Sequence, residues 1–145
     1  MLTTDQKGAI AEAAITYAAI RLGIEVYRPV AEGGRYDMIF DLRSRLARVQ
    51  CKWASRSGDV VVIRCYSARR TAEGLRVRKY TAEEVDFLAA YCRDLDRSFI
   101  LGPEHFDGRR MVYLRLRATR NNQRARVNRA DDFALEARLG DLLGP

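Results

Sequence analysis

The stretch that decides the fold spans residues 36–53 and reads YDMIFDLRSRLARVQCKW. Its two apolar runs, 36–42 and 46–53, predict neighbouring β-strands, because the polar residues between them are few enough for a tight turn. Side chains alternate between the two faces of a strand, so Gln50 and Lys52 share one face of the second strand. Asp37 opens the first strand and can lie across from this pair, although alternation alone does not fix its face.

A carboxylate, an amide and an ammonium group in this arrangement suit metal-assisted hydrolysis of a phosphodiester. Mg²⁺ (or Mn²⁺) takes oxygen ligands, which the Asp37 carboxylate and the Gln50 side-chain carbonyl would supply. Glu12 lies among alanines and could supply a third oxygen if its helix covers the sheet. Lys52 would place a positive charge beside the attacking water and the phosphate. We therefore expect Glu12, Asp37, Gln50 and Lys52 to form the catalytic site, the first three as metal ligands.

Each of these residues also has an ordinary structural explanation. Aspartate is common at turns, so Asp37 can simply end a loop. An edge strand with one solvated face would contain Gln50 and Lys52, and Glu12 would suit the exposed face of an amphipathic helix. The order of the elements favours the site: a helix with Glu12, a strand, a glycine loop at 33–34, and then the hairpin.

The other periodic segments predict an α/β or α+β architecture, with a mixed central sheet flanked by helices. Thr4 or Asp5 could cap the first helix. Thr81 and Glu84 resemble a capping box and predict the start of the second. Helices are expected over 5–22, 81–93 and 131–143, and strands over 24–27, 36–42, 46–53, 60–66, 98–101 and 111–117.

The composition fits one basic domain over residues 1–145. Hydrophobic residues make up 48% of the chain, enough for a core, and 26 basic against 19 acidic residues give a net charge of +7. This excess indicates a polyanion such as nucleic acid, or simply a well-solvated surface. Charge is concentrated in segment 69–79, whose charges look loop-borne, and in segment 119–130. The side chains expected to bind nucleic acid are Arg69, Arg70, Arg76, Arg78, Lys79, Arg120, Asn121, Asn122, Gln123, Arg124 and Arg126.

Several other classes of protein are disfavoured. Cys51, Cys65 and Cys92 are odd in number and lack metal-site spacing, so neither a disulfide framework nor a zinc site is expected. No segment approaches the roughly 20 apolar residues of a membrane span, and the N-terminus lacks a secretory pattern. We expect a cytoplasmic protein, associated with the nucleoid when DNA is bound.

The chain resembles the PD-(D/E)xK nuclease superfamily, in which an Asp and an acidic-x-Lys pair lie on adjacent strands behind a helix carrying a Glu. It is most similar to the PD-(D/Q)xK branch of homing endonucleases encoded in group I introns. The residues that carry the resemblance are Lys7, Gly8, Glu12, Gly23, Val26, Pro29, RYD at 35–37, VQCK at 49–52, YTAEEVD at 80–86, LRL at 114–116, NNQ at 121–123 and ADDF at 130–133.

The resemblance implies a restriction-endonuclease-like core and a Mg²⁺- or Mn²⁺-dependent endonuclease acting on double-stranded DNA. It carries over the same four site residues, and it implies a homodimer or homotetramer, because cutting both strands takes two sites. Three departures are visible: Val30 replaces an Asp, Tyr36 rather than Pro precedes Asp37, and Gln50 replaces the acid of the wider superfamily.

Other functions stay open. A Holliday-junction resolvase or a restriction-like nuclease would use the same core. The complete set of four site residues speaks against a non-catalytic DNA-binding module. A basic structural or RNA-binding domain is disfavoured because the aromatic residues Tyr66, Tyr80, Tyr91 and Tyr113 fall at core-like positions. The single histidine, His105, is expected in a loop as a surface or capping residue.

Overall fold

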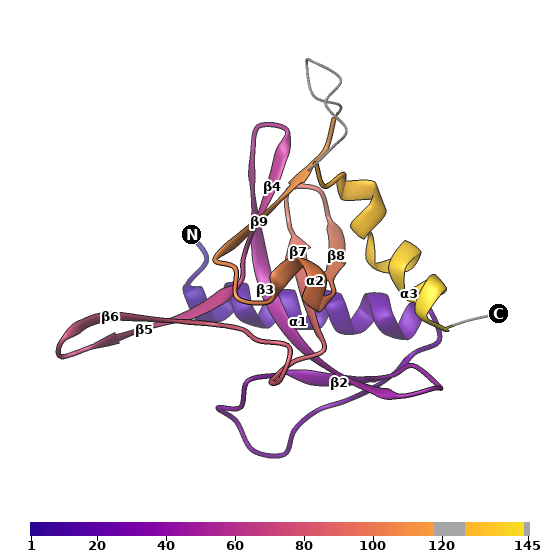
Figure 1. Ribbon diagram of the computed structural model, residues 1–145, viewed down its shortest axis with the longest axis horizontal. Helices are drawn as coiled ribbons and strands as arrows, with labels where there is room; N and C mark the ends of the chain where they lie inside the picture. The colour runs from indigo at the N-terminus through magenta and orange to yellow at the C-terminus, as the bar shows by residue number, and fades with distance from the viewer. Residues whose placement is uncertain (118–126, 144–145) are drawn as a thin grey trace.

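The computed structural model describes residues 1–117 and 127–143. Its centre is a mixed sheet of seven strands, with helix α1 across one face and a separate two-stranded hairpin reaching away from the sheet (Figure 1). None of the described helices is long and apolar enough to cross a membrane. The elements are α1 (Thr4–Arg21), β1 (Glu25–Tyr27), β2 (Met38–Asp41), β3 (Leu46–Ser57), β4 (Val60–Arg64), β5 (Tyr66–Thr71), β6 (Gly74–Lys79), β7 (Phe87–Cys92), β8 (Arg97–Leu101), α2 (Pro103–Phe106), β9 (Met111–Arg115), the 3₁₀ turn η1 (Ala130–Phe133) and α3 (Leu135–Leu143).

Strand β3 organises the sheet. Its first four residues pair antiparallel with β2, residues 49–54 pair parallel with β7, and its last three residues pair antiparallel with β4. β1 extends the sheet beyond β2, β8 beyond β7, and β9 beyond β4. The predicted hairpin over residues 36–53 is therefore confirmed as β2 and β3. The parallel β3–β7 pair makes the sheet mixed, as the predicted architecture requires.

Helix α1 begins with a capping box one residue before the expected cap. Thr3 Oγ1 accepts a hydrogen bond from the Gln6 N–H at 3.1 Å, and Gln6 Oε1 accepts one from the Thr3 N–H at 2.9 Å. Thr4 and Asp5 are already helical, so the prediction that either caps the helix is wrong. Residues four apart along α1 are buried against the sheet: Ala11, Ile15 and Ala19. This packing brings the neighbouring Glu12 close to β3.

The predicted helix over 81–93 is wrong, because the second half of this segment forms strand β7. Thr81 opens a single turn, in which the N–H groups of Glu84 and Val85 donate to its carbonyl oxygen. The chain then pairs with β3, and all six residues of β7 are buried. Alternate side chains enter two cores: Phe87, Ala89 and Tyr91 the core beneath α1, and Leu88, Ala90 and Cys92 the core on the other face. A continuous apolar run does not distinguish a doubly buried strand from a helix.

The strand predicted over 60–66 is divided at Cys65. β4 ends at Arg64, and a second strand, β5, begins at Tyr66 and pairs only with β6 among the described residues. We term this hairpin, residues 66–79, the basic ribbon. Figure 1 shows it extending away from the main sheet, and all of β6 is exposed. Its charges therefore lie on paired strands, so the expectation of loop-borne charges in segment 69–79 is wrong.

Candidate active site

Asp37 lies at the entrance to β2, where the backbone of β3 holds it. Its N–H donates to the Val49 carbonyl oxygen at 2.9 Å. Its carboxylate oxygen Oδ2 accepts from the Cys51 N–H, also at 2.9 Å. Cys51 stands between Gln50 and Lys52, so the hairpin brings the carboxylate to the backbone of the Gln-x-Lys stretch, as the sequence predicted.

Glu12 approaches the same place from α1. Glu12 and Asp37 both line a cavity of about 380 Å³, whose remaining wall is formed by the loop at 28–34 and by Tyr36. Arg28 lies at the rim, with its guanidinium 3.5 Å from a Glu12 carboxylate oxygen. The helix and the hairpin therefore bring two carboxylates to one cavity, although they are 25 residues apart in the sequence.

The electrostatics of the two carboxylates agree with this geometry. Burial raises the pKa of Glu12, and the nearby negative charge of Asp37 raises it further, against the opposing effect of Arg28. Burial also raises the pKa of Asp37, while the hydrogen bond from Cys51 and the charge of Lys52 lower it in part. A raised carboxyl pKa means that the folded protein penalises the charged form. A bound cation would offset that penalty for both groups.

Lys52 is largely buried beside Asp37 but is held by other groups. Its Nζ donates to the backbone oxygen of Tyr66 at 2.8 Å and lies 4.9 Å from the centroid of the Tyr80 ring. Burial lowers the pKa of Lys52, the charge of Asp37 raises it in part, and the charge of Arg35 lowers it. The ammonium group thus lies within the electrostatic range of Asp37, while its closest acceptor is a backbone oxygen of the basic ribbon.

Gln50 is half-buried on β3 and is the most weakly held of the four predicted residues. Its amide nitrogen donates a long hydrogen bond, 3.4 Å, to the carbonyl oxygen of Cys51. Its amide oxygen accepts no hydrogen bond from the part of the chain that the structure describes. That oxygen is therefore available, but no hydrogen bond joins Gln50 to Asp37 or Glu12.

These residues fit a hard divalent cation. Among residues 1–117 and 127–143, no three His, Cys, Asp or Glu side chains are grouped closely enough to hold a metal ion. The carboxylates of Glu12 and Asp37 are the acidic donors that line the cavity. The amide oxygen of Gln50, which is not part of the cavity wall, would be the third donor expected from the sequence. Mg²⁺ accepts such a small set of oxygen ligands because it keeps several of its waters.

The residues predicted to bind nucleic acid divide into two groups. Arg69, Arg70, Arg76, Arg78 and Lys79 are all exposed on the basic ribbon. Two of them have acidic neighbours: Arg76 pairs with Glu73 at 3.0 Å, and Arg78 with Glu84 at 2.6 Å. The second group, Arg120, Asn121, Asn122, Gln123, Arg124 and Arg126, lies outside the described residues.

The sequence analysis missed two neighbours of the site, Arg28 and Tyr80. Arg28 supplies the cation next to Glu12, and Tyr80 supplies an aromatic face to Lys52. Tyr80 is 28 residues from Lys52 along the chain, and neither strand alternation nor motif spacing reports such a contact. The one feature of the sequence that pointed to cations near Tyr80 was its position directly after the basic segment 69–79.

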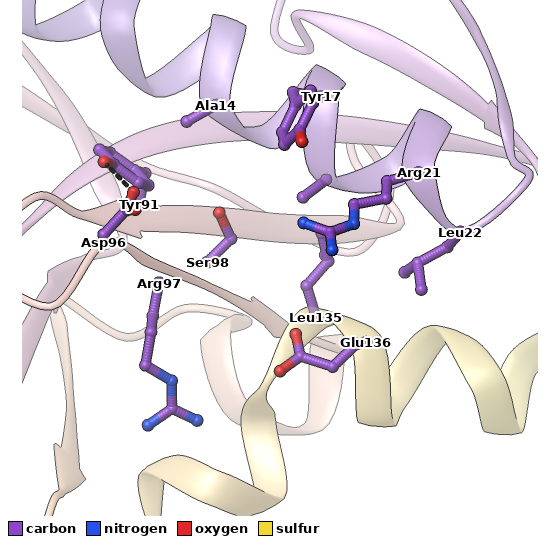
Figure 2. Close-up of a pocket in the computed structure, with 11 residues that line it drawn as sticks. Ala14, Tyr17, Arg21, Leu22, Tyr91, Asp96, Arg97, Ser98, Leu135 and Glu136 are labelled. Atoms are coloured by element: carbon purple, nitrogen blue, oxygen red, sulfur yellow. Dashed lines mark hydrogen bonds between the residues drawn. The ribbon is translucent and has the colours of Figure 1, made fainter.

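A second cavity, of about 510 Å³, lies between α1, α3 and the β7–β8 connection (Figure 2). Its wall carries Tyr17 and Arg21 from α1 and Glu136 from α3, and Tyr91 donates to Asp96 at 2.7 Å within it. None of the four predicted site residues lines this cavity, so the candidate site is confined to the smaller one and its surroundings.

Comparisons with known proteins agree with this architecture. The sequence profile of the PD-(D/E)XK endonuclease family matches residues 2–136. A search of solved structures finds a bacterial homing endonuclease, I-Ssp6803I, with a TM-score of 0.72 and 22% sequence identity over 97% of each chain. A comparison with curated proteins finds no match. Identity at this level shows a shared fold, whereas the profile covers most of the chain and shows the family. The chain belongs to the PD-(D/E)XK endonuclease family.

Proposed function

We propose that this nuclease is a metal-dependent endonuclease that hydrolyses phosphodiester bonds of double-stranded DNA with Mg²⁺ or Mn²⁺. The observation that carries the proposal is the meeting of the Glu12 and Asp37 carboxylates at one cavity, next to the ammonium group of Lys52. Two carboxylates with raised pKa values beside a partly buried lysine are typical of a functional site rather than of a solvated surface.

Each side chain has a task in this reaction. Glu12, Asp37 and the Gln50 amide oxygen would hold the ion, which acidifies a bound water and offsets charge on the phosphate. Lys52 provides a positive charge where the phosphate gains negative charge in the transition state. The β3 backbone fixes Asp37 through the Cys51 N–H, so the carboxylate is oriented before substrate binds. Each turnover consumes one water and breaks one phosphorus–oxygen bond, leaving a phosphate monoester and a hydroxyl end.

The basic ribbon supports duplex DNA as the substrate. A two-stranded β-ribbon has the width to enter the major groove. The ribbon extends from the sheet with five exposed basic side chains, and its first residue, Tyr66, accepts the hydrogen bond from Lys52. A duplex bound along the ribbon would therefore lead directly to the candidate site.

Cleavage of both strands would require a homo-oligomer, a dimer or a tetramer, because each chain carries one set of site residues. The shared fold of a bacterial homing endonuclease supports a site-specific version of the activity. A homodimer would place two such sites on one duplex.

The substrate class can be tested with end-labelled oligonucleotides of one sequence, offered as duplex DNA, single-stranded DNA and duplex RNA, each with Mg²⁺, Mn²⁺ or EDTA. Cleavage of duplex DNA with either metal ion and none with EDTA is expected. Random-sequence duplexes in the same assay test site preference. Preferential cleavage of RNA, or cleavage that persists in EDTA, would contradict the proposal.

A further inference from the structure

The ring of Tyr80 faces two cations that come from different parts of the chain. Lys52 Nζ lies 4.9 Å and the guanidinium carbon of Arg35 lies 4.1 Å from its centroid. Tyr80 is only 3% exposed, so both cations contact a ring that is shielded from solvent. Cation–π attraction is strongest when the partners are desolvated, which makes the ring an effective anchor for both groups.

Arg35 fastens this ring to the base of the basic ribbon. Its two terminal nitrogens donate to Ser67 Oγ and to the Lys79 backbone oxygen, each at 2.9 Å. Its Nε lies 3.1 Å from a carboxylate oxygen of Glu84, an ion pair without hydrogen-bond alignment. Ser67 and Lys79 belong to the two strands of the ribbon, β5 and β6. Arg35 therefore ties both strands of the ribbon to the chain two residues before Asp37.

Lys52 is fastened to the same base. Its hydrogen-bond acceptor, Tyr66, pairs directly with Lys79 at the first rung of the ribbon. The Tyr80 N–H donates to the Cys65 carbonyl oxygen, immediately before that rung. The ammonium group is thus enclosed by a ring and a carbonyl oxygen that both belong to the ribbon base.

We propose that Tyr80 is a positioning residue that holds the Lys52 ammonium group in place, and that Arg35 joins this unit to the basic ribbon. The inference rests on the proposed function, because it gives Lys52 its role in hydrolysis. A duplex that binds the ribbon is then aligned with the ammonium group through one contiguous set of contacts. A displacement of about 1 Å in a reacting group can cost roughly 10²-fold in rate, so the loss of the ring should affect catalysis more than binding.

The test is a double-mutant cycle on the cleavage rate at saturating protein, with the duplex dissociation constant measured separately. Tyr80→Leu should lower the rate at least about 10-fold with the dissociation constant changed less than about threefold. Tyr80→Phe keeps the ring and should restore the rate to within about twofold. In a Lys52→Ala background, Tyr80→Leu should cause less than about a twofold further loss, because its effect passes through Lys52. Tyr113→Leu, at an exposed tyrosine of β9, serves as the control and should leave the rate unchanged.

A second readout does not depend on cleavage. The chain has three lysines, Lys7, Lys52 and Lys79, so labelling lysine with ¹³C at the ε position gives three methylene signals, and Lys52→Ala identifies one. The ring of Tyr80 should shift the Lys52 signal, and this shift should disappear in Tyr80→Leu and persist in Tyr80→Phe. An unchanged Lys52 signal in Tyr80→Leu, or an equal loss of rate with and without Lys52, would overturn the inference. Absence of cleavage by the wild-type protein would instead overturn the proposed function, while the lysine spectra would still test the contact itself.

Discussion

At the scale of single residues, the candidate site depends on the Asp37 carboxylate, whose charged form is disfavoured by burial and favoured by a backbone hydrogen bond. Asp37 accepts a hydrogen bond from the Cys51 N–H, yet burial still raises its pKa. Keeping such a carboxylate charged lowers the stability of the folded protein, and a bound cation can offset this loss.

The sequence predicted the meeting of Asp37 and Glu12, because strand pairing and helix packing follow from periodic patterns. It could not predict the contact of Tyr80 with Lys52, which depends on where the basic ribbon joins the sheet.

Asp37→Asn should separate activity from stability. The asparagine oxygen can still accept from Cys51, so the fold is kept, while the charge is lost. Mg²⁺-dependent cleavage should fall by at least about 10²-fold, and the melting temperature should stay equal or rise, because the penalty on a buried charge disappears. Cleavage assays and thermal unfolding check both parts, with the exposed Asp94→Asn as the control. Full activity in Asp37→Asn would remove this residue from the site.

Two substitutions of Gln50 test whether its amide oxygen is a metal ligand. Gln50→Glu keeps an oxygen donor and adds a negative charge, so it should retain activity and bind Mg²⁺ more tightly in a calorimetric titration. Gln50→Leu has no oxygen donor and should be inactive while remaining folded. An active Gln50→Leu protein would show that Gln50 is only a half-buried strand residue.

At the scale of elements, the register of the basic ribbon gives it two different faces. Paired residues of an antiparallel hairpin share a face. One face carries the pairs Arg69–Arg76 and Ser67–Arg78, and the other carries Ala68–Val77 and Arg70–Leu75. Like charges directly opposite each other destabilise a hairpin unless a counter-charge is present. Glu73, 3.0 Å from Arg76, supplies part of that counter-charge within the ribbon. The first face carries three of the five basic side chains, Arg69, Arg76 and Arg78, so we expect this face to meet the phosphates.

The salt dependence of DNA binding tests this assignment. Each phosphate neutralised contributes about −0.9 to the slope of log K against log salt. The double variant Arg69→Gln, Arg76→Gln should flatten that slope by about 1.8 and weaken all duplex sequences alike. Arg93→Gln, at an exposed arginine between β7 and β8, should leave the slope unchanged. An unaltered slope in the double variant would remove this face of the ribbon from the interface.

The entry to β7 is fixed by an ion pair that the sequence did not reveal. Arg48 of β3 contacts both carboxylate oxygens of Asp86, with Nε and Nη2 donating at 3.1 and 3.2 Å, and its N–H donates to Asp86 at 2.7 Å. This clamp starts the parallel pairing of β3 and β7, so it explains why residues from 87 onward continue as a strand. Thr81 and Glu84 form a local capping pattern, which predicts the start of a helix from neighbouring residues alone. The contact between Arg48 and Asp86 joins residues 38 positions apart, so a local pattern cannot report it.

Asp86→Asn should reveal the contribution of the clamp through its pH dependence. Burial alone would raise the pKa of Asp86, but the hydrogen bonds from Arg48 lower it overall from the ordinary value of 3.8. The stabilisation is therefore present above the pKa of the unfolded chain and is lost as pH falls through the lower folded value. The free energy of unfolding of the variant should be about 1.5–3 kcal/mol lower than that of the wild type at pH 7. This difference in unfolding free energy should become smaller at acidic pH. Urea unfolding from pH 7 to pH 2 checks this; a difference independent of pH would contradict it.

At the scale of the whole molecule, one arrangement serves both packing and the proposed chemistry. Helix α1 packs its alanine-rich side on β3 and so delivers Glu12 to the cavity. β3 holds Asp37 on one side and presents Lys52 to the base of the basic ribbon. Most of this architecture could be predicted from the hairpin at 36–53 and the helix before it. The doubly buried β7 and the separate ribbon could not, because their form depends on partners distant in the sequence.

The most direct test of metal-dependent DNA cleavage is the conversion of supercoiled plasmid by the purified protein, followed on a gel with Mg²⁺, with Mn²⁺ and with EDTA. Nicked and then linear plasmid should appear with either metal ion and be absent in EDTA, and Lys52→Ala should reduce the rate by about 10²–10³-fold. Plasmid that remains supercoiled in both metal ions, from protein shown to be folded and to bind the duplex, would contradict the account.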